Sequence, residues 1–172
     1  GSSFGNVDKE IVLSTTDKWF RPVDIKLGPD GGIYIADWYD SRLSHVDPRD
    51  TWHKTSGRIY RLGPKNEGKP MQSFDISSYS NEKLVQLLSH ENKWFRQEAL
   101  RQFGDRKDPS SLPLLVKLLQ TGNEQEVLEA LWAINLTAGI NDEIGKMGLN
   151  HKDPFVRMWT VRLLGDKQSL SP

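Results

Sequence analysis

The stretch LSHENKWFRQEALRQFGDR at residues 88–106 decides the fold of the C-terminal part, because the chain contains it twice. A shift of 61 residues places it on LNHKDPFVRMWTVRLLGDK at 149–167. A shift of 31 residues gives a weaker middle copy, in which Leu88 meets Leu119. A period near 30 residues with helical spacing predicts stacked helical hairpins, an α-solenoid. The identical positions of the outer copies are Leu88, His90, Arg96, Arg101, Gly104 and Asp105, matched by Leu149, His151, Arg157, Arg162, Gly165 and Asp166.

The N-terminal part has a different period. In VDIKLGPDGGIYIADWYD at 23–40, apolar and polar residues alternate on both sides of a Pro-Asp-Gly-Gly turn. Alternation of period two around such a turn predicts a β-hairpin. Weaker alternating runs at 41–47 and 57–63 extend the prediction to an antiparallel meander of three or four strands.

These patterns predict an α+β chain, in which a small antiparallel β-meander precedes an α-helical solenoid. Residues 1–10 are expected to be a tag or disordered start, and 11–64 the β part. The Gly-, Pro- and Lys-rich sequence that follows predicts a linker over 65–79. Helical repeats are expected over 80–168, with Ser80 as the first N-cap.

Composition excludes several functional classes. The 172 residues include no cysteine, which rules out disulfides, thiolate metal sites and covalent attachment of c-type haem within this sequence. Lys+Arg and Asp+Glu both number 23, so no net positive charge attracts nucleic acid, and a nucleic-acid partner is not expected. The sequence also lacks an apolar run long enough for a membrane span.

One group of residues in the β part is a candidate site. Asp37, Asp40 and His45 lie at the end of one predicted strand and in the next run. Two interpretations are open: the three side chains ligate Ca²⁺ or face a substrate channel, or the two carboxylates bond turn amides and His45 is a surface residue. No catalytic residue is assigned, and no other set of residues predicts a metal site.

The helical segments resemble HEAT repeats. In HENKWFRQEALRQFGD and HKDPFVRMWTVRLLGD, an Asn or Asp precedes an aromatic residue and an Arg, as in the second helices of that family. The resemblance implies that the Arg pairs with an Asp at the turn between repeats. A structural ladder is therefore expected from Arg96 with Asp105 and from Arg157 with Asp166.

The β part resembles the last propeller blade of the glucose/sorbosone dehydrogenase-like family, in particular its planctomycete-type membrane-bound dehydrogenases. The similarity covers DKWFRPVDIKLGPDGGIYIADWYDSRLSHVDPRDTWHKTSGRIYRL at 17–62, and in that family HEAT-like helices and a c-type haem domain follow. A propeller needs several blades of about four strands each, and the three or four strands predicted here are enough for one blade. The resemblance therefore implies a non-catalytic fragment of an exported, periplasmic or cell-envelope, sugar- or alcohol-oxidising protein.

The same resemblance implies that no cofactor is bound by this fragment. Pyrroloquinoline quinone, Ca²⁺ or haem c would belong to the parent protein, and the partners would be the remaining blades and a haem domain. The alternative is a free-standing HEAT-repeat module that binds a protein partner on the concave face of its helices. A third and weaker hypothesis is a nucleic-acid-binding helical-repeat protein.

Overall fold

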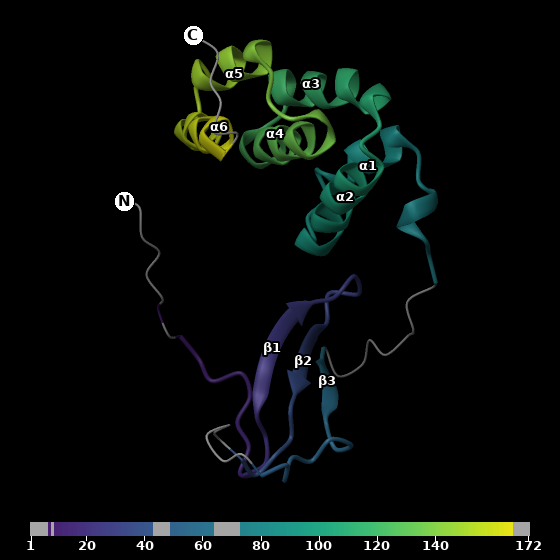
Figure 1. Cartoon of the computed structure of the whole chain (residues 1–172), viewed down its shortest axis with the longest axis vertical. Helices are drawn as coiled ribbons and strands as arrows, with labels where there is room; N and C mark the ends of the chain where they lie inside the picture. Colours follow the sequence, from purple (N-terminus) through teal and green to yellow (C-terminus); the bar gives the residue numbers. More distant parts are fainter. Residues whose placement is uncertain (1–6, 8, 43–48, 64–72, 167–172) are drawn as a thin grey trace. The chain divides into compact units, whose positions relative to one another are not determined.

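The computed structural model describes residues 7, 9–42, 49–63 and 73–166. The chain divides into two compact units, one made of Gly1–Gly28 and Gly32–Gly68 and the other of Pro29–Gly31 and Lys69–Pro172. The first contains the β-strands and is called the sheet unit; the second contains the helices and is called the helical unit (Figure 1). The expected α+β organisation, with a sheet before a helical-repeat region, is confirmed.

Three antiparallel strands form the sheet: β1 (Pro22–Leu27), β2 (Ile33–Asp37) and β3 (Arg58–Leu62), in the order β1-β2-β3. Gly28 N donates to Gly32 O across the turn between β1 and β2, at 2.7 Å. Gly31 adopts a φ of +73°, which a residue with a side chain rarely accepts. The hairpin expected from Pro-Asp-Gly-Gly is therefore present. The strand expected over 41–47 lies mostly outside the described residues.

One face of the sheet carries two rows of apolar residues. Ile25 pairs with Ile35, and Leu27 pairs with Ile33. Tyr60 and Leu62 of β3 continue these rows on the other side of β2. Only the central residue Ile35 is buried, whereas the β1 residues Ile25 and Leu27 are exposed. This face therefore leaves apolar surface uncovered along β1.

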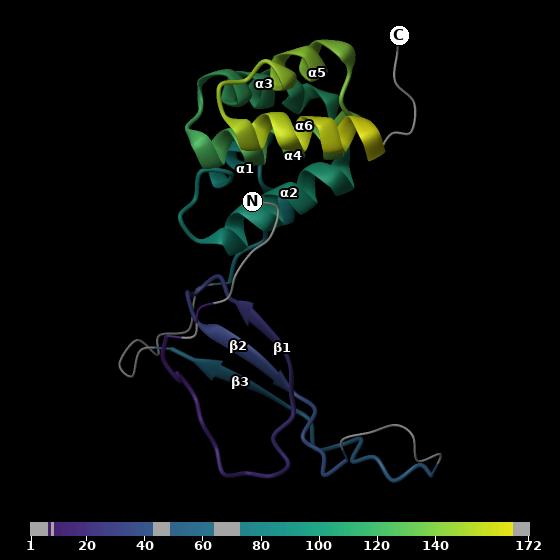
Figure 2. The ribbon, with the colours of Figure 1, turned by 90° about the vertical axis from the view of Figure 1, so that its left-hand side faces the viewer.

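In the described part of the helical unit, six α-helices form three hairpins. The first helices of the hairpins are α1 (Asn81–Leu87), α3 (Leu112–Thr121) and α5 (Asp142–Leu149), and the second helices are α2 (Lys93–Arg106), α4 (Glu124–Ala138) and α6 (Pro154–Asp166). The second helices lie side by side, with α2 packed on α4 and α4 on α6 (Figures 1 and 2). This arrangement is the stack expected from the repeats. Among the described residues, no helix has the length and apolar character needed to cross a membrane.

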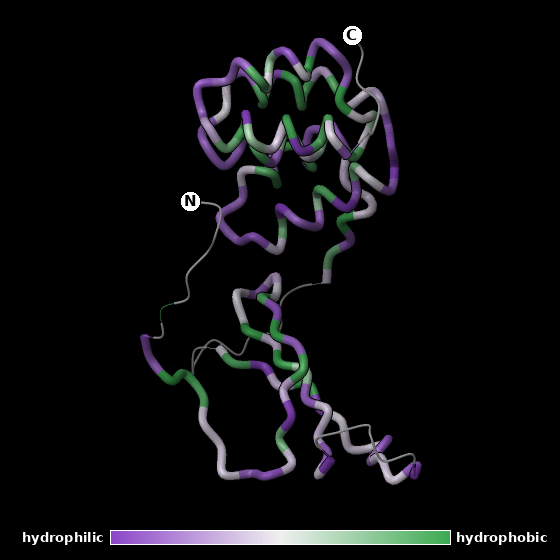
Figure 3. The backbone as a smooth tube through the Cα atoms, turned by 60° about the vertical axis from the view of Figure 1, so that its left-hand side comes forward, coloured by the Kyte–Doolittle hydropathy of each residue, from purple (hydrophilic) through white to green (hydrophobic). Residues whose placement is uncertain are grey.

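The core of the helical unit is centred on α4. Five of its apolar side chains are buried, and in Figure 3 hydrophobic positions recur along each helix of the unit. The middle hairpin has a neighbour on both sides, so α4 buries side chains toward α2 and toward α6. These buried apolar residues are Val127, Ala130, Leu131, Ala133 and Ile134.

Polar side chains fix the helix starts. Ser80 caps α1 as expected, and Asn92 caps α2. Asn123 and Glu126 form a reciprocal capping box at α4. Within the stretch expected to be a linker, a 3₁₀ turn at Ile76–Ser78 precedes α1, and Arg106 Nη1 donates to the Tyr79 carbonyl. These contacts fasten the chain just before α1 to the end of α2.

Candidate interaction site

The candidate carboxylates of the sheet unit bond to backbone amides. Asp37 Oδ1 accepts from the N–H groups of Arg21 at 2.7 Å and Tyr39 at 3.0 Å. Asp37 is 3% exposed, and its Oδ2 is buried with no hydrogen-bond partner among the described residues. Asp37 thus holds together the two chain segments at the end of the hairpin.

Asp40 has the same kind of role and is fully buried. Its Oδ1 accepts from Arg42 N at 2.9 Å, and its Oδ2 accepts from His53 N at 2.8 Å. Hydrogen bonds from these two amides, Arg42 first, hold the pKa of the Asp40 carboxyl below its usual value. Each oxygen of Asp40 therefore accepts a hydrogen bond from a backbone amide, and the carboxylate ties two segments of chain together.

The three candidate residues of the sheet unit do not form a described metal site. His45 lies outside the described residues. Across the described part of the chain, no three His, Asp or Glu side chains are placed to hold a metal ion together. The contacts of Asp37 and Asp40 are made to backbone amides, as the second interpretation expects, and ligation of Ca²⁺ or a place at a substrate channel stays a prediction. The bond from His53 to Asp40 could not be predicted from the sequence, because His53 contributes a backbone N–H, which no side-chain motif reveals.

In the helical unit, the recurring Arg residues do not pair with the expected Asp residues. Arg96 Nη1 donates to the carbonyls of His90 at 2.6 Å and Glu91 at 2.9 Å, and its Nε lies 3.0 Å from Glu129 Oε1. Asp105 instead lies beside Arg101, at 3.5 Å. Nine residues of helix separate Arg96 from Asp105, about 13 Å along the axis, which places them too far apart to pair.

The third hairpin repeats this geometry. Arg157 Nη1 donates to the carbonyls of His151 at 2.8 Å and Lys152 at 2.9 Å. Asp166 lies beside Arg162, as Asp105 lies beside Arg101. The recurring Arg therefore clamps the turn before its own helix, and the expected ladder from Arg157 to Asp166 is not formed.

A recurring His completes each clamped turn. His90 Nδ1 accepts from Asn92 N at 2.9 Å, and His151 Nδ1 accepts from Asp153 N at 3.1 Å. The spacing His-x-Asx-x-x-x-Arg is identical in the two hairpins. The clamped turn could have been predicted from this spacing, because the His and the Arg recur in both internal copies.

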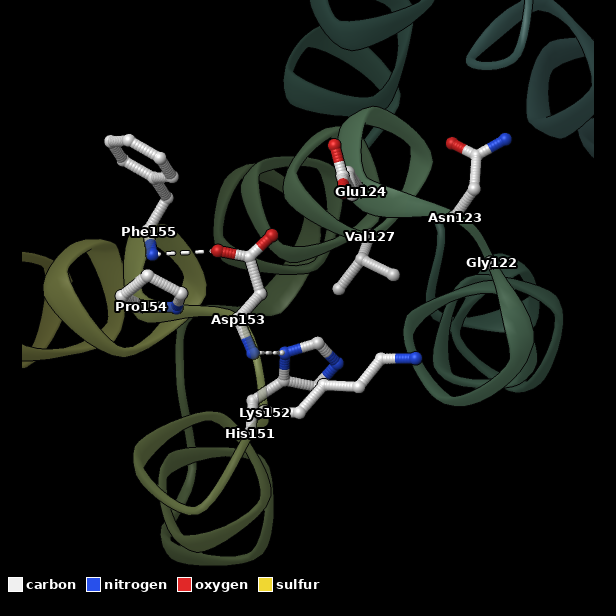
Figure 4. A pocket seen from close by; sticks show the side chains of 9 residues that line it. All are labelled: Gly122, Asn123, Glu124, Val127, His151, Lys152, Asp153, Pro154 and Phe155. Atoms are coloured by element: carbon white, nitrogen blue, oxygen red, sulfur yellow. Dashed lines mark hydrogen bonds between the residues drawn. The ribbon is translucent and has the colours of Figure 1, made fainter.

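The middle hairpin departs from the motif, and a pocket lies there. Val127 occupies the position that Arg96 and Arg157 hold in the outer copies, so the long Arg side chain of the motif is replaced by a short apolar one. A pocket of about 560 Å³ lies between the start of α4 and the turn before α6 (Figure 4). Its lining residues are Gly122, Asn123, Glu124, Val127, His151, Lys152, Asp153, Pro154 and Phe155.

The pocket combines apolar walls with a charged rim. Val127 and Phe155 supply apolar surface, and 60% of Phe155 is exposed. In Figure 4, dashed lines join His151 to the backbone of Asp153 and the Asp153 carboxylate to the backbone of Phe155, the latter at 2.7 Å. His151 and Asp153 therefore both serve the turn, and they do not form the direct His–carboxylate hydrogen bond of an acid–base pair.

Fold and site together define a helical-repeat protein with a small antiparallel sheet. Residues 75–136 match the family model of HEAT repeats. Residues 2–66 match the model of a domain of unknown function, DUF7133. No curated protein and no solved structure matches the chain. The expected HEAT-like character of the helices is confirmed by the match and by the three stacked hairpins.

Proposed function

We propose that the chain is a non-catalytic scaffold whose helical repeats hold another protein element. The observation that carries this proposal is that the candidate carboxylates of the sheet unit accept hydrogen bonds from backbone amides. Asp37 and Asp40 bind backbone amides, while apolar side chains remain exposed on both units. Exposed apolar side chains gathered on one face are typical of surfaces that bind other proteins.

The pocket at the starts of α4 and α6 is the proposed contact for a protein partner. Its apolar walls suit a side chain of a partner, and its rim offers Glu124 and Lys152 for polar contacts. Phe155 is the side chain with the most accessible apolar surface at this place. Phe155→Ala is therefore expected to weaken partner binding without loss of folding.

The proposed parent is an exported dehydrogenase-like protein. Support comes from the similarity of residues 17–62 to a terminal propeller blade and from the order of sheet before HEAT repeats. The exposed Ile25 and Leu27 on β1 would then face a neighbouring blade. Pyrroloquinoline quinone, Ca²⁺ or haem c would be bound by other parts of that parent, in the periplasm or cell envelope.

The second candidate is a free-standing HEAT-repeat module, which the match of residues 75–136 equally favours. Sequencing the coding region on both sides separates the two. The parent proposal predicts further blade-like strand repeats upstream and a Cys-x-x-Cys-His motif downstream. Stop codons close to both ends of the present sequence would contradict that proposal and leave the free-standing module.

A further inference from the structure

We propose that α6 carries a docking surface for one further helical hairpin of the same repeat type. This surface, here called the outward face of α6, consists of Arg157, Val161 and Gly165, which lie four residues apart along one side of the helix. The inference rests on the proposed scaffold function, since it names the kind of partner that the repeats hold.

The two earlier hairpins show that this side of the second helix is the side that a following hairpin covers. In α2 the three equivalent residues are half-buried, because α4 packs on them. In α4 they are buried or half-buried, because α6 packs on them. In α6 the same three positions are exposed, Val161 by 60%. The equivalent residues are Arg96, Leu100 and Gly104 in α2, and Val127, Leu131 and Asn135 in α4.

Contacts in the first pair of hairpins identify the occupant. Arg96 Nε bonds Glu129 of the next hairpin at 3.0 Å. Gly104 leaves room for Leu136, whose Cδ2 would lie 3.6 Å from a Cβ at that glycine. A Glu and a Leu, seven residues apart on α4, thus contact an Arg and a Gly of α2.

The outward face of α6 carries the same Arg and Gly as α2. Arg157 holds its turn carbonyls through Nη1 as Arg96 does, yet no carboxylate pairs with it among the described residues. A Cβ at Gly165 would meet no atom of the described residues within 4 Å. The surface therefore retains the Arg and the Gly of a docking face while the Glu and the Leu are missing.

Charge favours a further hairpin over a second copy of this chain. A parallel symmetric contact between two α6 helices would bring Arg157 of one copy against Arg157 of the other. Like charges at such a contact disfavour binding. A hairpin that carries a Glu in the position of Glu129 instead complements Arg157. Exposed Met158, beside this face, adds apolar area for the partner helix.

A chimera tests the proposal. The chain is continued after Asp166 with a copy of residues 106–139, the register set by the 61-residue repeat. We expect the amides of α6 to exchange hydrogen about tenfold more slowly than in the unextended chain. We also expect thermal unfolding in one transition at a higher temperature. Unchanged exchange in α6, with separate unfolding of the added hairpin, would overturn the proposal.

Two matched variants of the chimera sharpen the test. Gly165→Leu fills the space reserved for the incoming Leu, and Glu129→Gln within the added copy removes the partner of Arg157. Each is expected to cancel most of the slower exchange, whereas Gly165→Leu in the unextended chain should not lower the unfolding temperature, because a side chain at this position meets no described residue there. If neither variant changes the exchange, the added hairpin docks elsewhere and the proposal fails.

The unextended chain supplies the remaining outcome. Sedimentation over a range of concentrations is expected to show a monomer. Self-association abolished by Gly165→Leu would assign the outward face of α6 to a second copy and overturn the proposal. Because the coding-region test does not depend on these measurements, failure here is distinguishable from failure of the proposed function.

Discussion

Arg96 and Glu129 form an ion pair that joins α2 to α4, with Arg96 Nε 3.0 Å from Glu129 Oε1. Only 16% of the Arg96 side chain and 5% of the Glu129 side chain are exposed, so water screens the pair weakly. Gln125 Nε2 donates to the same Glu129 oxygen at 2.8 Å. The first two hairpins are therefore joined by a polar network as well as by the apolar core.

Glu129→Ala is expected to lower the free energy of unfolding by about 3 kcal/mol, because it leaves a largely buried guanidinium without its carboxylate. Chemical denaturation followed by circular dichroism measures the loss. Glu98→Ala is the control, since Glu98 forms only a loose pair with the exposed Arg101 at 3.8 Å and should cost at most about 0.5 kcal/mol. Equal losses in the two variants would contradict the inter-hairpin role of Glu129.

Asp37→Ala is expected to destabilise the sheet unit by about 2 kcal/mol, because the amides of Arg21 and Tyr39 lose a charged acceptor. Thermal unfolding of the wild type should be unaffected by millimolar Ca²⁺, since the Asp37 and Asp40 contacts are made to amides. A Ca²⁺-dependent rise in the unfolding temperature that Asp37→Ala abolishes would instead support a cation site.

The free energy of unfolding is expected to fall in acid. Backbone hydrogen bonds lower the pKa of Asp40, and a hydrogen bond from Asn81 is the main cause that lowers the pKa of Asp108. A carboxyl whose folded-state pKa is lowered stabilises the fold above its ordinary value, 3.8, and this contribution is lost as the pH falls through the lower folded-state value.

Urea unfolding between pH 6 and pH 2 measures this dependence. Asp108→Asn should flatten the part of the curve that belongs to the helical unit, because the variant has no proton to bind at that position. A wild-type curve that stays level down to pH 2 would show that these hydrogen bonds do not favour the charged carboxylates.

Two helical glycines are expected to respond oppositely to alanine. A Cβ at Gly148 of α5 would overlap the side chain of Thr160 in α6, so Gly148→Ala should destabilise by about 1–3 kcal/mol. In the described part of the chain a Cβ at Gly165 meets nothing within 4 Å, so Gly165→Ala should stabilise by at most about 1 kcal/mol through helix propensity. Differential scanning calorimetry of both variants checks the signs. A stabilising Gly148→Ala would show that α5 and α6 are packed less closely than described.

Local and periodic features could be predicted from the sequence. The turn at Pro29–Gly32 needs only local backbone preferences, and Ser80 as a cap needs only the next turn of chain. The three hairpins follow from the 61-residue and 31-residue repeats, because repetition of an amphipathic unit implies stacking. These features depend on residues close in sequence or on a regular period.

Side-chain partners were harder to predict because they depend on how elements pack. Glu129 lies 33 residues from Arg96, and only the stacking of α2 on α4 brings them together. His53 reaches Asp40 through a backbone amide across an intervening loop. Val127 lines the pocket beside α4, and alignment of the three repeats shows that it stands where the outer copies have an Arg. That replacement was the signal for the pocket.

The most direct test of the scaffold account is a dye-linked oxidation assay of the purified chain. A panel of sugars and alcohols is offered with and without added pyrroloquinoline quinone and Ca²⁺, and heat-unfolded protein provides the background rate. Rates equal to that background are expected under every condition. Turnover above background under any of these conditions would contradict the non-catalytic scaffold.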